Sequence, residues 1–128
     1  MTRALADTSL FIADEAGRAL RADQLPEELA VSIITIAELR VGVLAAVDTA
    51  TRDRRLTTLA RAAELQPLPI DEPVADAWAR LRIELRSAAR RMPLNDSWIA
   101  ATAIALGVPV VTQDADYEGV PGLEVIRV

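Results

Sequence analysis

The chain has 128 residues, of which 52% are hydrophobic, and this suffices for one packed domain spanning residues 1–128. It contains no Cys and no His, and its 14 basic residues are all Arg. These absences exclude disulfides, thiolate or imidazole catalysis, the usual zinc sites and any reaction that needs a Lys. The net charge of −5 argues against nonspecific nucleic-acid binding over the whole surface.

Short apolar or β-branched runs alternate with longer amphipathic runs from the start of the chain. Residues 4–6 predict a buried strand that stops at Asp7, followed by one or two helical turns over residues 8–13. Residues 29–34 predict a second strand. Thr35 is expected to cap the next helix, which reaches about Ala46, with Glu38 three residues on as its capping-box partner.

Two amphipathic helices are predicted in the middle of the chain. The first begins at Thr49 or Thr51 and ends at Leu65. The second is capped by Asp71 and reaches about Arg91, with apolar residues at helical spacing along one face.

The last third of the chain predicts one more helix and two more strands. Asn95 or Asp96 opens an almost wholly apolar helix that ends at Gly107. Residues 108–112 and 123–128 are the strand candidates. Strands separated by helices favour an α/β class, here a single three-layer α/β/α domain with a mainly parallel central sheet.

The apolar stretch at the start of the chain is too short for a signal peptide, and no run reaches the ~18 apolar residues of a membrane span. We therefore expect a cytoplasmic protein with no membrane partner.

Several carboxylates follow the predicted strands or open the next helix. They are Asp7, Glu38, Asp96, Asp114 and Asp116. The carboxyl ends of parallel strands share one edge of a sheet, where ligands bind. Converging carboxylates repel one another unless a cation holds them, and all-oxygen ligation suits Mg²⁺ or Mn²⁺. Each residue taken alone is equally typical of a helix cap or a turn.

Four ordered stretches resemble the signatures of the PIN domain. They are Asp7 to Ser9, Ser32 to Leu39, Asn95 to Ala103, and Thr112 to Tyr117, where the family commonly has Phe in place of Tyr117. Within that family the chain most resembles the VapC-type ribonuclease toxins of bacterial toxin–antitoxin pairs. The resemblance implies a Mg²⁺-dependent endoribonuclease (Mn²⁺ is possible) that hydrolyses RNA and leaves 5′-phosphate and 3′-hydroxyl ends.

The resemblance also implies roles for particular residues. The implied catalytic carboxylates are Asp7, Glu38, Asp96 and Asp114. Asp7 and Asp96 are expected to ligate the metal ion, with Asp114 helping directly or through water, and Asp116 can share or take over the role of Asp114. Glu38 is expected to orient the attacking water or to complete a second metal site. Ser9 and Thr112 are the usual hydroxyl companions.

Five arginines and a single glutamate fall within residues 80–91. Arg82, Arg86 and Arg90 are four residues apart, which places them on one face of the predicted helix. We interpret this face as a strip that follows RNA phosphates, although a solvated helix face has the same pattern. With only four aromatic residues in the chain, base stacking should contribute little.

The resemblance implies a cognate VapB-like antitoxin and a homodimer as partners. The helices around residues 35–65 have more apolar side chains than one sheet face can readily cover: Val41, Leu44, Val47, Leu56 and Leu59. An antitoxin could lay an apolar helix there and send an Arg or Lys toward the Asp7–Asp96 cluster. The alternative is that these side chains simply pack on the sheet.

Two other functions are compatible with an α/β chain of this length. A signalling receiver domain also has an acidic Mg²⁺ pocket, but its chemistry needs a Lys, and this chain has none. A catalytically silent PIN fold that binds RNA or protein is the remaining alternative. A test of metal-dependent RNA cleavage distinguishes that module from the enzyme.

Overall fold

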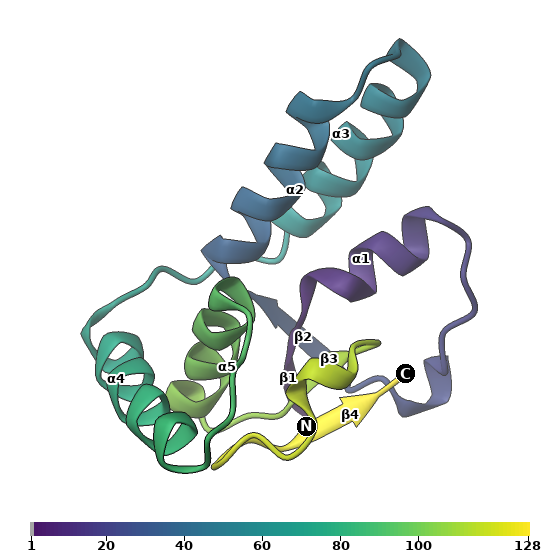
Figure 1. The fold of residues 1–128 in the computed structure, drawn as a ribbon. Helices are drawn as coiled ribbons and strands as arrows, with labels where there is room; N and C mark the ends of the chain where they lie inside the picture. The colour runs from purple at the N-terminus through teal and green to yellow at the C-terminus, as the bar shows by residue number, and fades with distance from the viewer. Residues whose placement is uncertain (1) are drawn as a thin grey trace.

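The fold is that of a computed structural model, in which residues 2–128 are described (Figure 1). Its centre is a sheet of four parallel strands in the order β2-β1-β3-β4. The strands are β1 (Arg3–Ala6), β2 (Glu28–Val31), β3 (Val110–Thr112) and β4 (Val125–Arg127). All four expected strands are therefore confirmed, and the sheet is parallel throughout the described residues.

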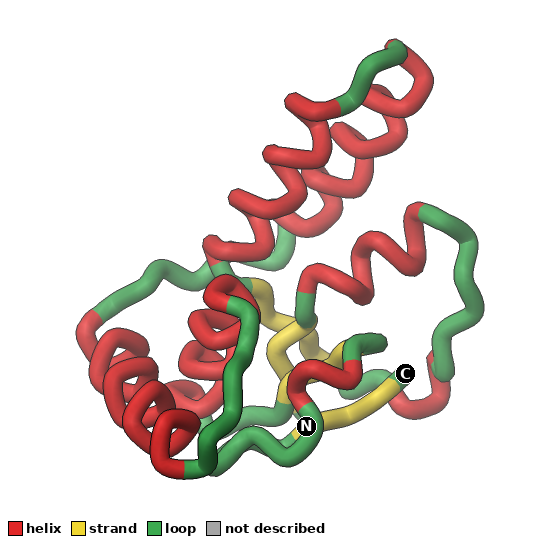
Figure 2. Tube along the Cα trace, viewed as in Figure 1, coloured by secondary structure: helices red, strands yellow, loops and turns green. Residues whose placement is uncertain are grey.

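The helices lie on both sides of this sheet (Figures 1 and 2). They are α1 (Thr8–Glu15), α2 (Ile33–Ala45), α3 (Thr49–Ala63), α4 (Glu72–Ser87) and α5 (Leu94–Leu106). Helix α1 covers one face and α4 with α5 the other, while α2 and α3 form a hairpin that projects away from the sheet. This confirms the predicted three-layer α/β/α class. Across residues 2–128, no helix has both the length and the apolar composition needed to cross a bilayer.

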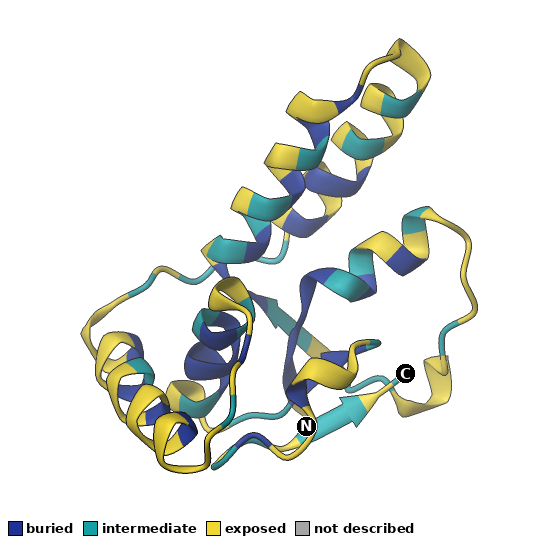
Figure 3. Ribbon diagram, viewed as in Figure 1, coloured by how far each residue is buried: buried dark blue, intermediate teal, exposed yellow. Residues whose placement is uncertain are grey.

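Most of β1 is buried (Figure 3), and successive residues along the strands pack into two different layers of the core. Leu5 and Val110 are fully buried against α4 and α5, whereas Ala4, Ala6 and Val111 pack on the α1 side. Burying one large aliphatic side chain contributes about 1.5–3 kcal/mol, so a sheet buried on both faces is a rigid platform. The loops at its carboxyl edge, where the predicted acids lie, are thus fixed on well-packed strands.

The start of α2 differs from the prediction. Strand β2 ends at Val31, and Ser32 caps the helix, its Oγ accepting the amide hydrogen of Ile34 at 3.0 Å. Thr35 is instead buried inside the first turn. The prediction was wrong because the β-branched run at 33–36 is apolar in both a strand and a helix pattern, which periodicity alone does not separate.

The end of α4 also differs. The helix stops at Ser87 rather than near Arg91, in a turn in which the Arg90 amide donates to the Leu85 carbonyl at 2.9 Å. Ala89 takes the left-handed conformation (φ 53°) at the position where glycine is usual. Because no glycine stands here, the sequence does not indicate that the helix ends at this point. Arg90 is therefore not on a helical face with Arg82 and Arg86, as the four-residue spacing predicted.

Candidate metal and active site

Three of the predicted acids converge at the carboxyl edge of the sheet. Asp96, Asp114 and Asp116 each offer a carboxylate oxygen, and these oxygens all lie within 4.8 Å of one another. Asp96 is half-buried in the first turn of α5, which begins at Leu94 and not at Asn95 or Asp96 as predicted. Asp114 and Asp116 are exposed in the loop after β3. We call these three residues the acidic triad.

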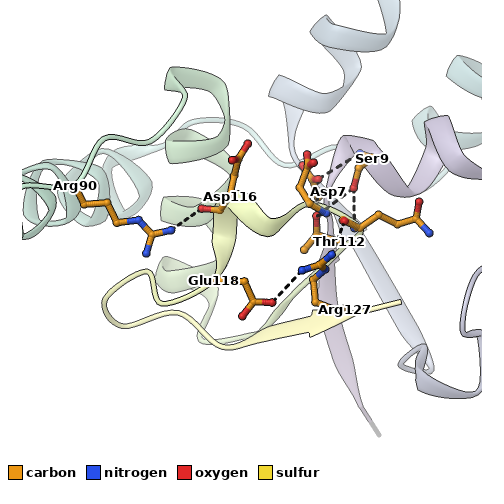
Figure 4. Close-up of polar contacts among 9 residues, drawn as sticks. Asp7, Ser9, Arg90, Thr112, Asp116, Glu118 and Arg127 are labelled. Carbon is orange, nitrogen blue, oxygen red and sulfur yellow. Dashed lines mark hydrogen bonds and ion pairs between the residues drawn. The ribbon is translucent and has the colours of Figure 1, made fainter.

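Asp7 lies outside the acidic triad and is buried beneath it, with 2% of its surface exposed. It follows β1 directly and caps α1. Its Oδ1 accepts the Tyr117 hydroxyl at 2.8 Å. Its Oδ2 accepts the Thr112 hydroxyl at 2.9 Å and the Ser9 amide at 3.3 Å (Figure 4). A buried carboxylate is costly unless it is hydrogen-bonded, and these donors also fix its orientation.

Two hydroxyls join the ends of β1 and β3 below the acidic triad. Because the Thr112 hydrogen is donated to Asp7, the 3.1 Å contact between Ser9 Oγ and Thr112 Oγ1 has Ser9 as its donor. The Gln113 amide then donates to Ser9 at 3.0 Å and the Asp114 amide to Thr112 at 2.9 Å. The hydroxyl companions thus connect Asp7 to the backbone of the loop that carries Asp114.

Tyr117 is a residue that the sequence interpretation missed, since it was regarded only as a conservative replacement for Phe. Its ring is fully buried, and its hydroxyl lies 2.8 Å from Asp7 and 3.3 Å from Asp96. A phenol has one hydrogen, so the contact with Asp96 is satisfied best when Asp96 holds a proton. Burial and the charges of both acids raise the pKa of Tyr117 well above its usual range, so it remains a donor. A buried phenol hydroxyl usually has a hydrogen-bond partner, and this requirement could have pointed to Tyr117 from the sequence.

The crowding of acids changes their ionisation. Burial, followed by the charge of Asp7, raises the pKa of Asp96 to about 7. Burial, Asp7 and Asp116 also raise the pKa of Asp114. Because the site disfavours the ionised forms of Asp96 and Asp114, a bound cation would stabilise both carboxylates.

We expect the metal-free protein to lose stability as the pH rises from about 4 to about 7. In this window the folded protein keeps the Asp96 proton, because its pKa is about 7, whereas the unfolded chain has lost it. The folded state therefore binds more protons, and its free energy of unfolding falls with increasing pH. Melting temperatures in EDTA between pH 4.5 and 8 would measure the effect, and Asp96→Asn should remove most of the slope. A wild-type slope of the opposite sign would contradict this assignment.

Glu38 lies outside the acidic triad and is hydrogen-bonded to Thr8, the residue that follows Asp7. The Thr8 hydroxyl donates to Glu38 Oε1 at 2.7 Å, so the 2.9 Å contact between Thr8 and Thr35 has Thr35 as its donor. Glu38 is not a capping-box partner of Thr35, because Ser32 caps the helix. Its half-buried carboxylate borders a hollow of about 200 Å³ between α1 and the α2–α3 hairpin.

The arginines predicted to follow RNA surround one hollow of about 320 Å³. Its lining comprises Arg82, Leu85, Arg86, Arg90, Arg91 and Met92. Within residues 2–128, none of these arginines pairs with a carboxylate. The guanidinium of Arg82 lies 5.2 Å from the ring centre of Trp78, whereas Arg90 reaches the acidic loop and donates to the Asp116 carbonyl at 2.8 Å. The basic hollow therefore adjoins the acidic triad.

Comparison with known proteins identifies the family of the chain. The family model of the PIN domain matches residues 4–123, and the chain belongs to this family.

Relatives within the family are close. Ribonuclease VapC5 of Mycobacterium tuberculosis is 49% identical over 95% of this chain and 93% of its own length. Ribonuclease VapC4 of the same organism is 50% identical, over 98% and 97%. The crystal structure of VapBC-5, a member of the VapBC family of toxin–antitoxin systems from M. tuberculosis, matches with a TM-score of 0.91 and 44% identity over 100% of both chains. These similarities confirm the resemblance to VapC-type proteins drawn from the four motifs.

Proposed function

We propose that this chain is a metal-dependent endoribonuclease toxin that hydrolyses RNA phosphodiester bonds and is restrained by a cognate antitoxin. The observation that carries the proposal is the convergence of three carboxylates above a buried, fully hydrogen-bonded Asp7. The names of the VapC4 and VapC5 relatives support the ribonuclease activity.

The donor set fits a hard divalent cation. The site offers only carboxylate and hydroxyl oxygens, in a chain without Cys or His, and this favours Mg²⁺ or Mn²⁺ over zinc or copper. The acidic triad would hold the ion, with Asp7 at its buried side. When bound, such an ion lowers the pKa of a coordinated water and offsets charge on the phosphate.

The remaining steps are assigned to the chain itself. Glu38, kept in place by the Thr8 hydroxyl, would orient the water that attacks phosphorus. Ser9 and Thr112 keep Asp7 and the Asp114 backbone in register. Attack would displace the 3′ oxygen of the ribose and leave a 5′-phosphate.

The products give a direct test of this chemistry. We expect RNA fragments made by the purified protein to accept an adaptor in a ligation that requires a 5′-phosphate, without prior kinase treatment. Sequencing the ligated ends would also identify the RNA and the cut site. Fragments that ligate only after kinase treatment would contradict hydrolysis with this polarity, and an absence of fragments would favour the silent PIN-fold binding module.

We further propose that Arg82, Arg86 and Arg90 contact the RNA backbone beside the acidic triad. The support is their shared hollow and the absence of carboxylate partners within the described chain. Phosphate contacts of this kind are sequence-independent and depend on salt.

The double variant Arg82→Gln/Arg86→Gln should weaken RNA binding and flatten its salt dependence. Each phosphate contact that is lost removes roughly 0.7–0.9 units from the slope of log affinity against log salt. Binding titrations of the metal-free protein at several salt concentrations would measure the slope. Arg54→Gln/Arg61→Gln on α3 removes the same charge elsewhere and should leave the slope nearly unchanged. Equal slopes for the two double variants would indicate that Arg82 and Arg86 make no contacts with RNA phosphates.

The partner surface that we propose is the outer side of the α2–α3 hairpin. Val41, Leu44, Val47 and Leu56 are exposed there by 65, 74, 98 and 43%, whereas Leu59, which we had expected to be exposed, is buried between the two helices. Apolar side chains exposed together on one surface commonly mark an interface. A VapB-like antitoxin and a second copy of the chain are the proposed partners. The VapBC structure that the chain matches supports the antitoxin.

A further inference from the structure

Two arginines hold the loop that carries Asp114 and Asp116, one from each side (Figure 4). Arg90, just beyond α4, donates from Nη2 to the main-chain oxygen of Asp116 at 2.8 Å. Arg127, in β4, donates from Nη2 to the main-chain oxygen of Gln113 at 3.0 Å. The two carbonyls flank Asp114, so both ends of the acidic segment are fixed.

Both arginines bind main-chain carbonyl oxygens of the loop and not the carboxylates of Asp114 or Asp116. The second contact of Arg127 is an ion pair with Glu118 at 3.2 Å, and Glu118 is not in the acidic triad. Within residues 2–128, no ion pair uses the carboxylates of Asp114 or Asp116. The arginines therefore fix the backbone while the carboxylate oxygens stay available to a cation.

The loop needs such restraint because its negative charges repel one another and those of Asp96 in this conformation. Asp114 and Asp116 are exposed on a short segment and face Asp96 within 4.8 Å. Like charges at this separation repel one another. Hydrogen bonds from charged donors are stronger than those between neutral groups, and two of them at the ends of the segment counter that repulsion.

Arg90 is placed for this contact by a specific turn. Ala89 adopts the left-handed conformation (φ 53°), which is unfavourable for a residue with a Cβ, and the chain then leaves the axis of α4. The half-buried Arg90 packs against Gly119, where an added Cβ would lie 3.3 Å from Nη1. The turn at the end of α4 thus takes Arg90 off the helical face of Arg82 and Arg86 and brings it to the acidic loop, while all three arginines still border one hollow.

We propose that Arg90 and Arg127 are positioning residues that hold the 113–118 loop in the shape that binds a divalent cation. The inference rests on the proposed metal-dependent nuclease function. It assigns Arg90 a role separate from any phosphate contact made by Arg82 and Arg86.

The sign of the change in metal affinity tests this role. Calorimetric titration of the purified chain with Mn²⁺ should show binding about tenfold weaker for Arg90→Gln and for Arg127→Gln, the lower end of the loss on removing an outer contact of a metal site. Coulomb's law alone predicts the reverse, because each variant removes a positive charge near the bound cation. Arg80→Gln, whose arginine pairs with Asp76 on the far surface of α4, should bind like the wild type. Affinity that is unchanged or tighter in the Arg90 and Arg127 variants would overturn the proposal.

Hydrogen exchange of the loop gives a second readout that needs neither metal nor activity. In EDTA, the amides of residues 113–118 should exchange faster in both positioning variants than in wild type or Arg80→Gln, with α5 unchanged. Equal acceleration in α5 would indicate general destabilisation, and unchanged loop exchange would show that the contacts restrain nothing, so either result would overturn the proposal. If the wild-type chain bound no Mn²⁺, the proposed function would fail, and exchange would still decide the role of the arginines.

Discussion

Asp96→Asn is expected to lower RNA cleavage by more than about 100-fold, since the loss of an outer partner of a metal site alone costs up to that factor. Asp96 is the member of the acidic triad fixed on a helix. It lies 3.3 Å from the Tyr117 hydroxyl and within 4.8 Å of carboxylate oxygens of Asp114 and Asp116. Its amide replacement has nearly the same shape but neither the charge nor the second acceptor oxygen. The fold should persist and be somewhat more stable without metal, because a neutral amide avoids the cost of burying the Asp96 charge and its repulsion with Asp7.

The measurement is the initial cleavage rate at saturating Mg²⁺, with the melting temperature in EDTA as a check of folding. Asp53→Asn, an exposed carboxylate in α3, is the matched control and should cleave like wild type. Asp7→Asn should be equally inactive but less stable, because an amide cannot accept all three donors that contact this buried carboxylate. A wild-type rate in Asp96→Asn would remove the acidic triad from the mechanism.

A saturated complex with the cognate antitoxin should have almost no ribonuclease activity. The hairpin exposes apolar side chains, and beside it the hollow between α1 and α2 is bordered by Glu15 and Glu38. An apolar antitoxin helix would be complementary to the exposed hairpin surface. A following Arg or Lys that reaches the acidic triad would compete with the metal ion there.

Co-expression with the neighbouring gene product and purification of the complex would measure this inhibition. Leu44→Asp places a charge on the exposed hairpin surface and should prevent the complex while leaving free ribonuclease activity unchanged. Ile83→Asp, a similarly exposed apolar position on α4, should leave the complex intact. Full activity in a saturated complex would exclude this mode of restraint.

The sequence predicted the fold well because short apolar strand runs alternate with longer helical runs, of which α3 and α4 are clearly amphipathic. Errors occurred where local pattern is ambiguous. The run 33–36 suits a strand or a helix, and the end of α4 depends on an unusual left-handed Ala89. Both features depend on how the chain packs and not on local propensity.

Asp7, Asp96, Asp114 and Asp116 could be chosen as candidates because each follows a strand or lies in the first turn of a helix, which is a local property, whereas Glu38 lies in the second turn of α2. Their hydrogen-bond partners could not, since they depend on which strands become neighbours. Arg127 reaches Gln113 because Arg127 in β4 pairs with Thr112 in the neighbouring strand β3. Tyr117 reaches Asp7 from 110 residues away, through the close approach of β1 and β3.

The most direct test of the central claim is to titrate the purified protein with Mn²⁺ and follow calorimetric binding and RNA cleavage in parallel. We predict that the concentration giving half-maximal cleavage coincides with the dissociation constant, and that Asp96→Asn loses both binding and cleavage. Cleavage that persists in excess EDTA, or metal binding that is unaffected in Asp96→Asn, would contradict the assignment of the acidic triad as the catalytic metal site.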